Sequence, residues 1–505
     1  MNVQRASMIL LFLIATLAAA TASASSPFQN DDVTAIVGAT IIDGNGGPPL
    51  TEATIVVSDG RITDIGPKSF IEVAPGAQVI DGTGKYVMPG LVDTNVHMSP
   101  LRGQPTFARY WDRLDEIVLQ GVQLQLKYGT TTVRDSYGTL LPLIKVRDAI
   151  ARGDAIGPRM YVAGNIIGWG GPYSDTFSRI RESGLSLFEE QINDFFSQGT
   201  GEDLMHMTPD ELRLALNAYL DKGPDFIKFG GTWHINYPTL ISFSPRAQRV
   251  IVEETQKRGL VAETHSTTLE GLLISIEAGI DLIQHPEVVG HREITDELVE
   301  LIVEREIICS LLPNKYTGKI WEEHLEKQEE AKNKQEEEKE AQRRTAKTTA
   351  ELRREQEETG IANPETLLIP NLEMRRRNAK KLIEAGAIIS VGPDNVIGVA
   401  PEFRRTKKSE HLEPGIGTII AIEGLVELGM TPSQAIVAAT RNGALACKGL
   451  EEFGTLEGGK LADLLMLGSD PLADISNLRT LEMVMKEGQN IDLEALPTVR
   501  PYRAW

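Results

Sequence analysis

Eight short apolar runs alternate with polar or helical segments between residues 85 and 391. They are residues 85–98, Thr130–Arg134, Arg159–Ala163, Asp225–Phe229, Leu260–Thr264, Asp281–Gln284, Ile307–Leu312 and Ala387–Val391. Helical periodicity separates several of them, as at Pro209–Leu220, Pro245–Arg258 and Leu269–Ala278. Short strands alternating with helices are typical of a parallel sheet. Eight such units predict an α/β fold, a (β/α)8 barrel of the TIM type, with function at the carboxyl ends of its strands.

The two ends of the chain follow a different pattern. Residues 33–84 contain short apolar stretches that are followed by Asp-Gly or Asn-Gly turns, which is typical of hairpins. Residues 454–490 repeat this pattern, with expected strands at Ala462–Leu467 and Thr480–Met485. We expect the two ends to pair into one small discontinuous β-sandwich domain, with the barrel at residues 85–445 between its halves.

The first 24 residues have the features of a secretory signal peptide. Arg5 precedes the apolar run Met8–Ile14, and Ala22–Ala24 fits a small-residue cleavage site. The run is too short to span a membrane. We therefore expect an exported protein, periplasmic or secreted, with no membrane span after signal removal. Export permits a disulfide between Cys309 and Cys447, but two buried free thiols in apolar segments are the favoured interpretation.

A charged insertion follows the seventh expected strand. Residues 322–358 are almost all Glu, Lys, Gln, Arg and Ala, too polar to form a core of their own. We expect a solvated helix or helical hairpin, with disorder as the alternative. A role in covering the barrel mouth or in serving a partner is the less favoured interpretation of this segment. The formal charge of the whole chain is −20, which argues against nucleic acid or an anionic membrane as a partner.

Residues of the metal-binding type stand at the ends of five expected strands. They are His97 on the first strand, Lys228 on the fourth, His265 on the fifth, His285 on the sixth and Asp394 after the eighth. The carboxyl ends of barrel strands meet at one mouth, so we expect these side chains to converge. Zinc binds imidazole nitrogen and carboxylate oxygen and leaves a position for water in catalytic sites. The sequence therefore predicts a metal-dependent site.

These residues and their surroundings resemble the amidohydrolase superfamily of metal-dependent hydrolases. The similarity runs from about residue 33 to 490 and includes MPGLVDTNVH, TTTVRDSYG, GPRMYVAGN, GPDFIKFGGT, GIDLIQHPE, GMTPSQAIVAAT and GTLEGGKLADLLML. The chain is most similar to the imidazolonepropionase-like branch, which includes exported dipeptidases and N-acyl amino acid hydrolases. The resemblance implies cleavage of an amide or peptide-like C–N bond in a dipeptide, an N-acyl amino acid or a cyclic amide.

The resemblance also assigns roles to the residues. In this family His265 and His285 would hold one metal, and His97 and Asp394 a second. A carboxylated Lys228 would bridge the two. Asp394 would take a proton from the attacking water and return it to the leaving nitrogen. Without metal, we expect an unmodified Lys228 whose ammonium points toward Asp394 or the histidines.

The sequence departs from the family pattern at Asn95, where the family has the first of two histidines on the same strand face. An amide oxygen is a poorer zinc ligand than imidazole, so we expect one tightly bound Zn²⁺ rather than two. Pro286 and Pro393, each next to a ligand position, depart as well. These changes leave open a catalytically weak or inactive protein that serves as a binding or scaffold protein. The retained residues favour an enzyme with a small-molecule substrate, and a homo-oligomer is compatible with the sequence.

Two loops near the expected mouth carry further candidates. Trp233-His234 follows the fourth strand, where His234 either contacts substrate or is an ordinary surface residue. Gly168–Gly171 follows the third strand and suggests a flexible mouth loop, not a phosphate site, because no P-loop spacing is present. The remaining histidines, His206, His291, His324 and His411, have no ligand spacing.

Overall fold

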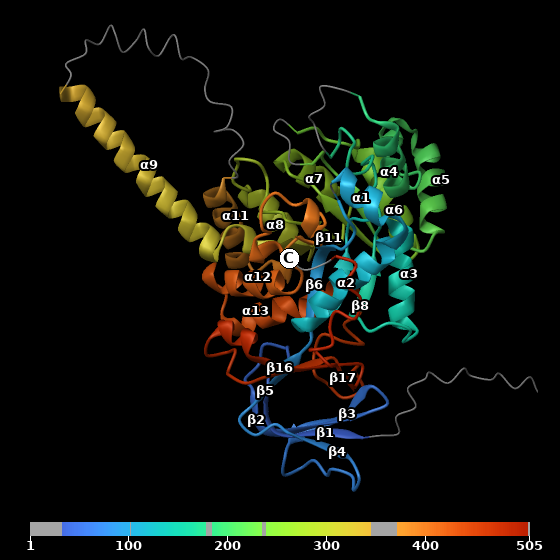
Figure 1. The fold of residues 1–505 in the computed structure, drawn as a ribbon, viewed down its shortest axis with the longest axis vertical. Helices are drawn as coiled ribbons and strands as arrows, with labels where there is room; N and C mark the ends of the chain where they lie inside the picture. Colours follow the sequence, from blue (N-terminus) through green and yellow to red (C-terminus); the bar gives the residue numbers. More distant parts are fainter. Residues whose placement is uncertain (1–32, 102, 178–183, 235–238, 345–370, 503–505) are drawn as a thin grey trace, which may run out of the picture.

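The computed structural model describes residues 33–101, 103–177, 184–234, 239–344 and 371–502. The expected signal peptide at residues 1–24 lies outside the described residues. A large upper part holds parallel strands surrounded by helices, and a smaller lower part holds a sheet made from both ends of the chain (Figure 1).

Each of the eight expected runs of the central region contains a strand. They are β6 (Leu91–His97), β7 (Thr130–Asp135), β8 (Arg159–Val162), β9 (Phe226–Gly230), β10 (Val261–His265), β11 (Leu282–Gln284), β12 (Ile308–Leu311) and β13 (Ile388–Val391). β9 to β13 form one parallel sheet in chain order, and β6, β7 and β8 form another with the short β14 (Asn395–Val396) at its edge. This is the strand order of a TIM-type fold.

Single hydrogen bonds connect the two parallel sheets where no ladder joins them among the described residues. Between β8 and β9, the Asp225 amide donates to the Val162 carbonyl at 2.8 Å, and the Ile167 amide donates to the Lys228 carbonyl at 2.9 Å. Between β13 and β6, Thr94 Oγ1 donates to the Val391 carbonyl at 2.8 Å. Backbone amides on one side and the buried Thr94 side chain on the other therefore help to hold the two sheets together.

Helices cover the outer face of the parallel strands (Figure 1). They are α1 (Gln104–Tyr110), α2 (Leu114–Lys127), α3 (Leu140–Ala151), α4 (Leu187–Ser197), α5 (Pro209–Leu220), α6 (Pro245–Lys257), α7 (Leu269–Glu277), α8 (Asp296–Glu304), α11 (Leu372–Glu384), α12 (Ile416–Glu427), α13 (Pro432–Ala439) and α14 (Arg441–Ala446). The three helices expected from periodicity are α5, α6 and α7. Thr208, Ser244 and Thr268 cap their first turns, each accepting a backbone hydrogen bond.

The interior of the parallel strands carries a layer of hydrogen-bonded polar side chains. Arg134 on β7 forms an ion pair with Glu263 on β10 at 2.6 Å, and both are buried. Gln284 Nε2 donates to Glu263 Oε1 at 3.0 Å. Since Glu263 precedes His265 by two residues on the same strand, this layer lies directly beneath the strand ends. Removing one partner of a buried ion pair typically costs ~3–5 kcal/mol, so the layer gives the strand ends a firm base.

The lower sheet contains β1 (Thr34–Ile41), β2 (Leu50–Ser58), β3 (Arg61–Pro67), β4 (Gln78–Asp81) and β5 (Tyr86–Pro89) from one end of the chain, and β15 (Leu464–Leu467), β16 (Leu481–Lys486) and β17 (Gln489–Asn490) from the other. β15 pairs antiparallel with β5 and joins the two sets. The described strands of this part form one eight-stranded sheet, so the two-layer β-sandwich is not confirmed. The chain leaves this sheet at Gly90, where a Cβ would collide with the Thr131 side chain.

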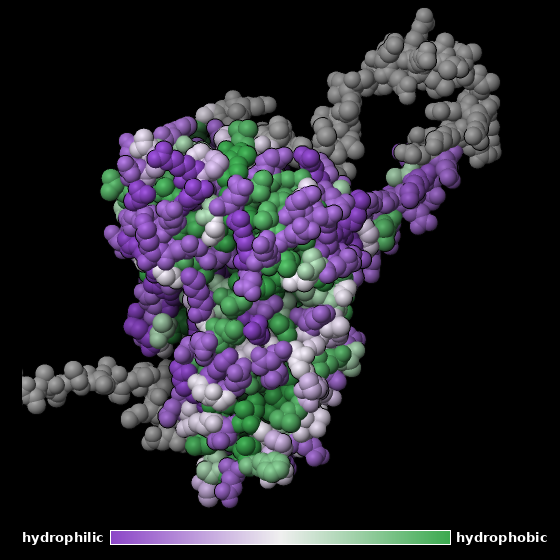
Figure 2. Space-filling model, turned by 180° about the vertical axis from the view of Figure 1, so that it is seen from behind, coloured by the Kyte–Doolittle hydropathy of each residue, from purple (hydrophilic) through white to green (hydrophobic). Residues whose placement is uncertain are grey.

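Helix α9 (Gly318–Arg344) contains the first part of the charged insertion expected at residues 322–358, and residues 345–358 lie outside the described part of the chain. It projects from the body (Figure 1), and its surface is mainly hydrophilic (Figure 2). At its base the Arg376 guanidinium lies 4.3 Å from the centre of the Trp321 ring. A cation–π contact of this kind holds the start of α9 against α11.

Cys309 and Cys447 are both buried and unpaired, as expected. No helix in the described ranges is long and apolar enough to cross a membrane.

Candidate active site

A cavity of about 360 Å³ opens at the carboxyl ends of the parallel strands. Its lining contains all five residues expected there from the sequence, namely His97, Lys228, His265, His285 and Asp394. His97 and His265 are the last residues of β6 and β10, and His285 directly follows β11. Convergence of residues that are up to 297 positions apart follows from the common direction of the strands.

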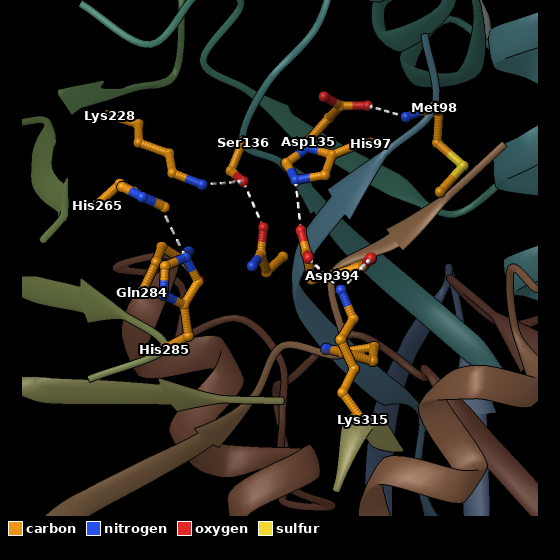
Figure 3. A network of polar contacts seen from close by, with 12 residues as sticks. His97, Met98, Asp135, Ser136, Lys228, His265, Gln284, His285, Lys315 and Asp394 are labelled. Atoms are coloured by element: carbon orange, nitrogen blue, oxygen red, sulfur yellow. Dashed lines mark hydrogen bonds and ion pairs between the residues drawn. The ribbon is translucent and has the colours of Figure 1, made fainter. Parts of the chain in front are cut away.

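Asp394 lies between an imidazole and an ammonium group. His97 Nε2 donates to Asp394 Oδ1 at 2.7 Å, and Lys315 Nζ forms an ion pair with Oδ2 (Figure 3). Burial alone would raise the pKa of the Asp394 carboxyl, but Lys315 and His97 outweigh burial and hold the pKa well below 3.8. Asp394 is therefore ionised at neutral pH.

His265 and His285 form the second pair in the cavity. Their Nδ1 and Nε2 atoms, respectively, lie 3.0 Å apart, with one imidazole donating to the other (Figure 3). Burial lowers the pKa of both histidines, that of His285 to about 3, so both are neutral at pH 7. A neutral imidazole has one nitrogen lone pair free for a metal.

Two of the cavity residues have an unusual backbone conformation. His285 has a φ of 41° and Asp394 a φ of 57°, a region that residues other than glycine rarely adopt. Such conformations cluster at functional sites, where the surrounding structure must hold them in place.

Lys228 contacts a residue that the sequence did not indicate. Its Nζ donates to Ser136 Oγ at 3.0 Å (Figure 3). Ser136 Oγ in turn donates to Asn95 Oδ1 at 2.5 Å. The expectation that the Lys228 ammonium would turn to Asp394 or the histidines needs correction, because its hydrogen bond goes to Ser136 and Lys315 takes the place beside Asp394. Burial lowers the pKa of the Lys228 amine, which raises its neutral fraction.

The donor types in the cavity fit a divalent cation, although the described residues contain no group of three or more His, Cys, Asp or Glu side chains arranged to hold one. Two imidazole nitrogens on one tetrahedral zinc are about 3.3 Å apart, close to the 3.0 Å between His265 and His285. These two residues therefore fit one cation with little movement. His97 and Asp394 form a separate pair, joined by a hydrogen bond.

Among the aromatic cavity residues, Tyr137 and Phe177 were not found from the sequence, whereas Trp169 belongs to the Gly168–Gly171 segment expected at the mouth. Tyr137, Trp169 and Phe177 form an aromatic wall, in which Phe177 stacks on His234 at 4.6 Å between ring centres. The Trp169 ring lies 4.8 Å from that of His265. His234, left open between substrate contact and surface, thus lines the cavity.

Lys315 and Arg375 supply two further cations to the lining. Lys315 closely follows β12, and this position after a strand was a usable signal. Arg375 lies on α11, outside the strand-end pattern, and nothing in the sequence indicated it.

Comparisons with known proteins agree with this geometry. A solved structure of molinate hydrolase superposes with a TM-score of 0.79 at 30% identity, covering 95% of this chain and 98% of that one. Phenylurea hydrolase B gives a TM-score of 0.78 at 28% identity, covering 94% and 100%. Ochratoxinase of Aspergillus niger is 25% identical over 468 residues, 88% of this chain and 82% of that protein. The pattern of the Amidohydrolase family matches residues 86–491, and the chain belongs to this family of hydrolases.

Proposed function

We propose that this protein hydrolyses an amide-type C–N bond of a small-molecule substrate, using a divalent cation held by His265 and His285. The observation that supports the proposal most strongly is the convergence of these two neutral imidazoles, an ionised Asp394 and a buried Lys228 on one cavity. Family membership and the hydrolases among the similar proteins support the reaction class.

Zn²⁺ is the proposed cation, with one per chain favoured because Asn95 replaces an imidazole. When bound, it would act as a Lewis acid and lower the pKa of water toward neutrality. Lys228 is the proposed site of carboxylation. Its buried amine has a lowered pKa, and only the neutral amine reacts with carbon dioxide.

Asp394 is the proposed general base and acid. Its carboxylate would accept a proton from water and return it to the leaving nitrogen of the amide. Lys315 and His97 hold the pKa of Asp394 well below its usual range, which weakens the carboxylate as a base, and release of Lys315 from Oδ2 would strengthen it. His97 remains on Oδ1 and keeps the carboxylate oriented.

The aromatic wall would receive an apolar or aromatic part of the substrate. Tyr137, Trp169 and Phe177 present ring faces and edges to the cavity, while the cation and Asp394 would act on the C–N bond. Phenylurea hydrolase B acts, by its name, on ureas that carry a phenyl group, which is consistent with an aromatic substrate here.

The test combines metal analysis with a substrate panel. Purified protein, loaded with Zn²⁺, is incubated with N-acyl amino acids, dipeptides, anilides and aryl ureas, and products are identified by mass spectrometry. Release of amine from at least one class, lost in Asp394→Asn, would support the proposal. Tight substrate binding without turnover by metal-loaded protein would instead favour a binding or scaffold protein.

We also propose that the protein is exported and that the mature chain begins near Ser25. Amino-terminal sequencing of protein from its native compartment tests this, and a chain beginning at Met1 or Asn2 would contradict it.

A further inference from the structure

We infer that Arg375 binds a carboxylate of the substrate and thereby selects amides that carry a free carboxylate beyond the scissile bond. This inference rests on the proposed function, since it names the substrate class of the same cavity. It adds an anion-binding residue to the site.

Arg375 lines the cavity without a hydrogen bond or ion pair to any described residue through its guanidinium. The next residue, Arg376, has partners through Nη1 and through the face of its guanidinium. It donates to the Tyr316 carbonyl at 3.0 Å, pairs with Glu427 at 2.5 Å and covers Trp321. A guanidinium offers five N–H donors in a planar fork that matches a carboxylate. A partly buried donor without an acceptor lowers the stability of the folded protein, and a bound ligand that accepts these hydrogen bonds removes that cost.

The other cations of the cavity already have partners. Lys315 is paired with Asp394, and Lys228 donates to Ser136. Arg375 is therefore the cation of the lining that remains available to a ligand among the described residues. It also lies in the first turns of α11, where the helix dipole favours an anion.

Glu287 is the acidic residue whose charge acts most on Arg375, yet no ion pair joins them in the described structure. Glu287 Oε1 instead accepts from the Leu312 amide at 3.0 Å and from the Tyr316 hydroxyl at 2.9 Å. Both bonds go to Oε1, and Oε2 is buried without a hydrogen-bond partner, so no contact between described residues joins the Glu287 carboxylate to the Arg375 guanidinium.

The position of Arg375 relative to the aromatic wall defines the shape of the substrate. Trp169 follows β8, the third of the eight parallel strands, while α11 follows β12, the seventh. Third and seventh strands lie on opposite sides of an eight-stranded arrangement. His265 and His285 follow the fifth and sixth strands, between the two sides. The substrate that fits is an amide with an apolar or aromatic group on one side and a carboxylate on the other.

The first test compares two amides that differ only in the carboxylate, N-benzoylphenylalanine and N-benzoyl-2-phenylethylamine. The measured quantity is the ratio of their kcat/KM values. We expect wild-type protein to favour the acid, and Arg375→Met to lower the ratio by about 10- to 100-fold, the size expected for a lost charge-assisted hydrogen bond. The ratio for Arg375→Lys should lie between those of the wild type and Arg375→Met, since lysine keeps the charge without the planar guanidinium. Arg377→Met, an exposed arginine on the same helix, is the matched control and should keep the wild-type ratio.

The second test needs no turnover and separates this inference from the proposed function. Binding of 4-phenylbutanoate and 4-phenylbutan-1-ol to the full chain is measured by calorimetry, with and without Zn²⁺. We expect Arg375→Met to weaken binding of the carboxylate about 10- to 100-fold in both conditions. If no amide is hydrolysed but this loss is seen, the proposed function fails and the carboxylate site stands. Unchanged carboxylate affinity would overturn the inference even in an active enzyme.

A purely structural role of Arg375 gives a different result. If Arg375 only compensates the negative charge of Glu287, Arg375→Met should lower the melting temperature. Adding Glu287→Gln to that variant should then restore the melting temperature. The ratio of the two kcat/KM values would then stay at the wild-type level in both variants, which would overturn the inference.

Discussion

Lys315 and His97 hold opposite oxygens of the Asp394 carboxylate, Lys315 on Oδ2 and His97 on Oδ1. Lys315 comes from the segment after β12, and His97 ends β6, so three separate strand ends meet at one carboxylate. The general base expected from the sequence is therefore restrained by Lys315, a cation that the prediction did not include.

Lys315→Met should shift the acidic limb of the kcat/KM profile to higher pH. Lys315 lowers the pKa of Asp394, so its removal must raise that pKa, and a nearby charge typically accounts for about 1–3 pH units. The pH dependence of hydrolysis measures this. Lys319→Met, an exposed lysine at the start of α9, is the control. An unmoved acidic limb would mean that Lys315 does not act on Asp394 during turnover.

Asp394→Asn should reduce hydrolysis at least ~100-fold, the usual contribution of a general base. Asparagine has nearly the same volume and keeps the fold, but its amide does not accept a proton from water. Steady-state kinetics give the loss, and the melting temperature checks the fold. Unchanged turnover would remove Asp394 from the mechanism.

Asn95→His should increase the number of bound metal ions. The unaltered protein should hold fewer than two tightly bound metals, because Asn95 is buried and its amide oxygen accepts from Ser136. Mass spectrometry of purified protein gives the metal content of both forms. Two tightly bound metals per chain before substitution would show that Asn95 does not limit occupancy.

Lys228→Ala should lower both metal affinity and hydrolysis, because the carboxylated lysine would help to hold the cation. Competition with a chelator measures the metal affinity, and steady-state kinetics measure the rate of hydrolysis. In a scaffold protein the same change should affect only stability, through loss of the hydrogen bond to Ser136. Full activity with unchanged metal content would show that the role of Lys228 is misassigned.

Asp93→Asn should flatten the dependence of stability on pH between about 4 and 7. Burial raises the pKa of the Asp93 carboxyl from 3.8 to about 7, so the folded protein holds a proton in this range that the unfolded chain has released. Unfolding is therefore favoured as pH rises from about 4 to 7, by on the order of 4 kcal/mol at the upper end. Denaturant titrations at several pH values measure this slope. If the variant shows the same dependence of unfolding free energy on pH, titratable groups other than Asp93 are responsible for that dependence.

Much of the site followed from the positions of residues along the chain. His97, His265 and His285 each end a short apolar run, and parallel strands bring their carboxyl ends to one mouth. Lys315 also follows a strand closely, but the prediction did not include it. The partner of Lys228 was not predictable, because Ser136 and Lys228 meet through the packing of β7 and β9 across the interior.

Residue order alone was enough to predict the alternation of strands and helices, the strand ends that carry imidazole, amine and carboxylate groups, and the loss of one imidazole at Asn95. These are local properties, set by hydrophobic periodicity and by residue type. The partners of the charged groups, Lys315 for Asp394 and Ser136 for Lys228, depend on how the strands pack against one another. Tertiary structure also left the Arg375 guanidinium facing the cavity while Arg376 packs on Trp321. Neighbouring residues on one helix point in different directions, and only the packing of α11 against the strand ends determines which of them reaches the substrate.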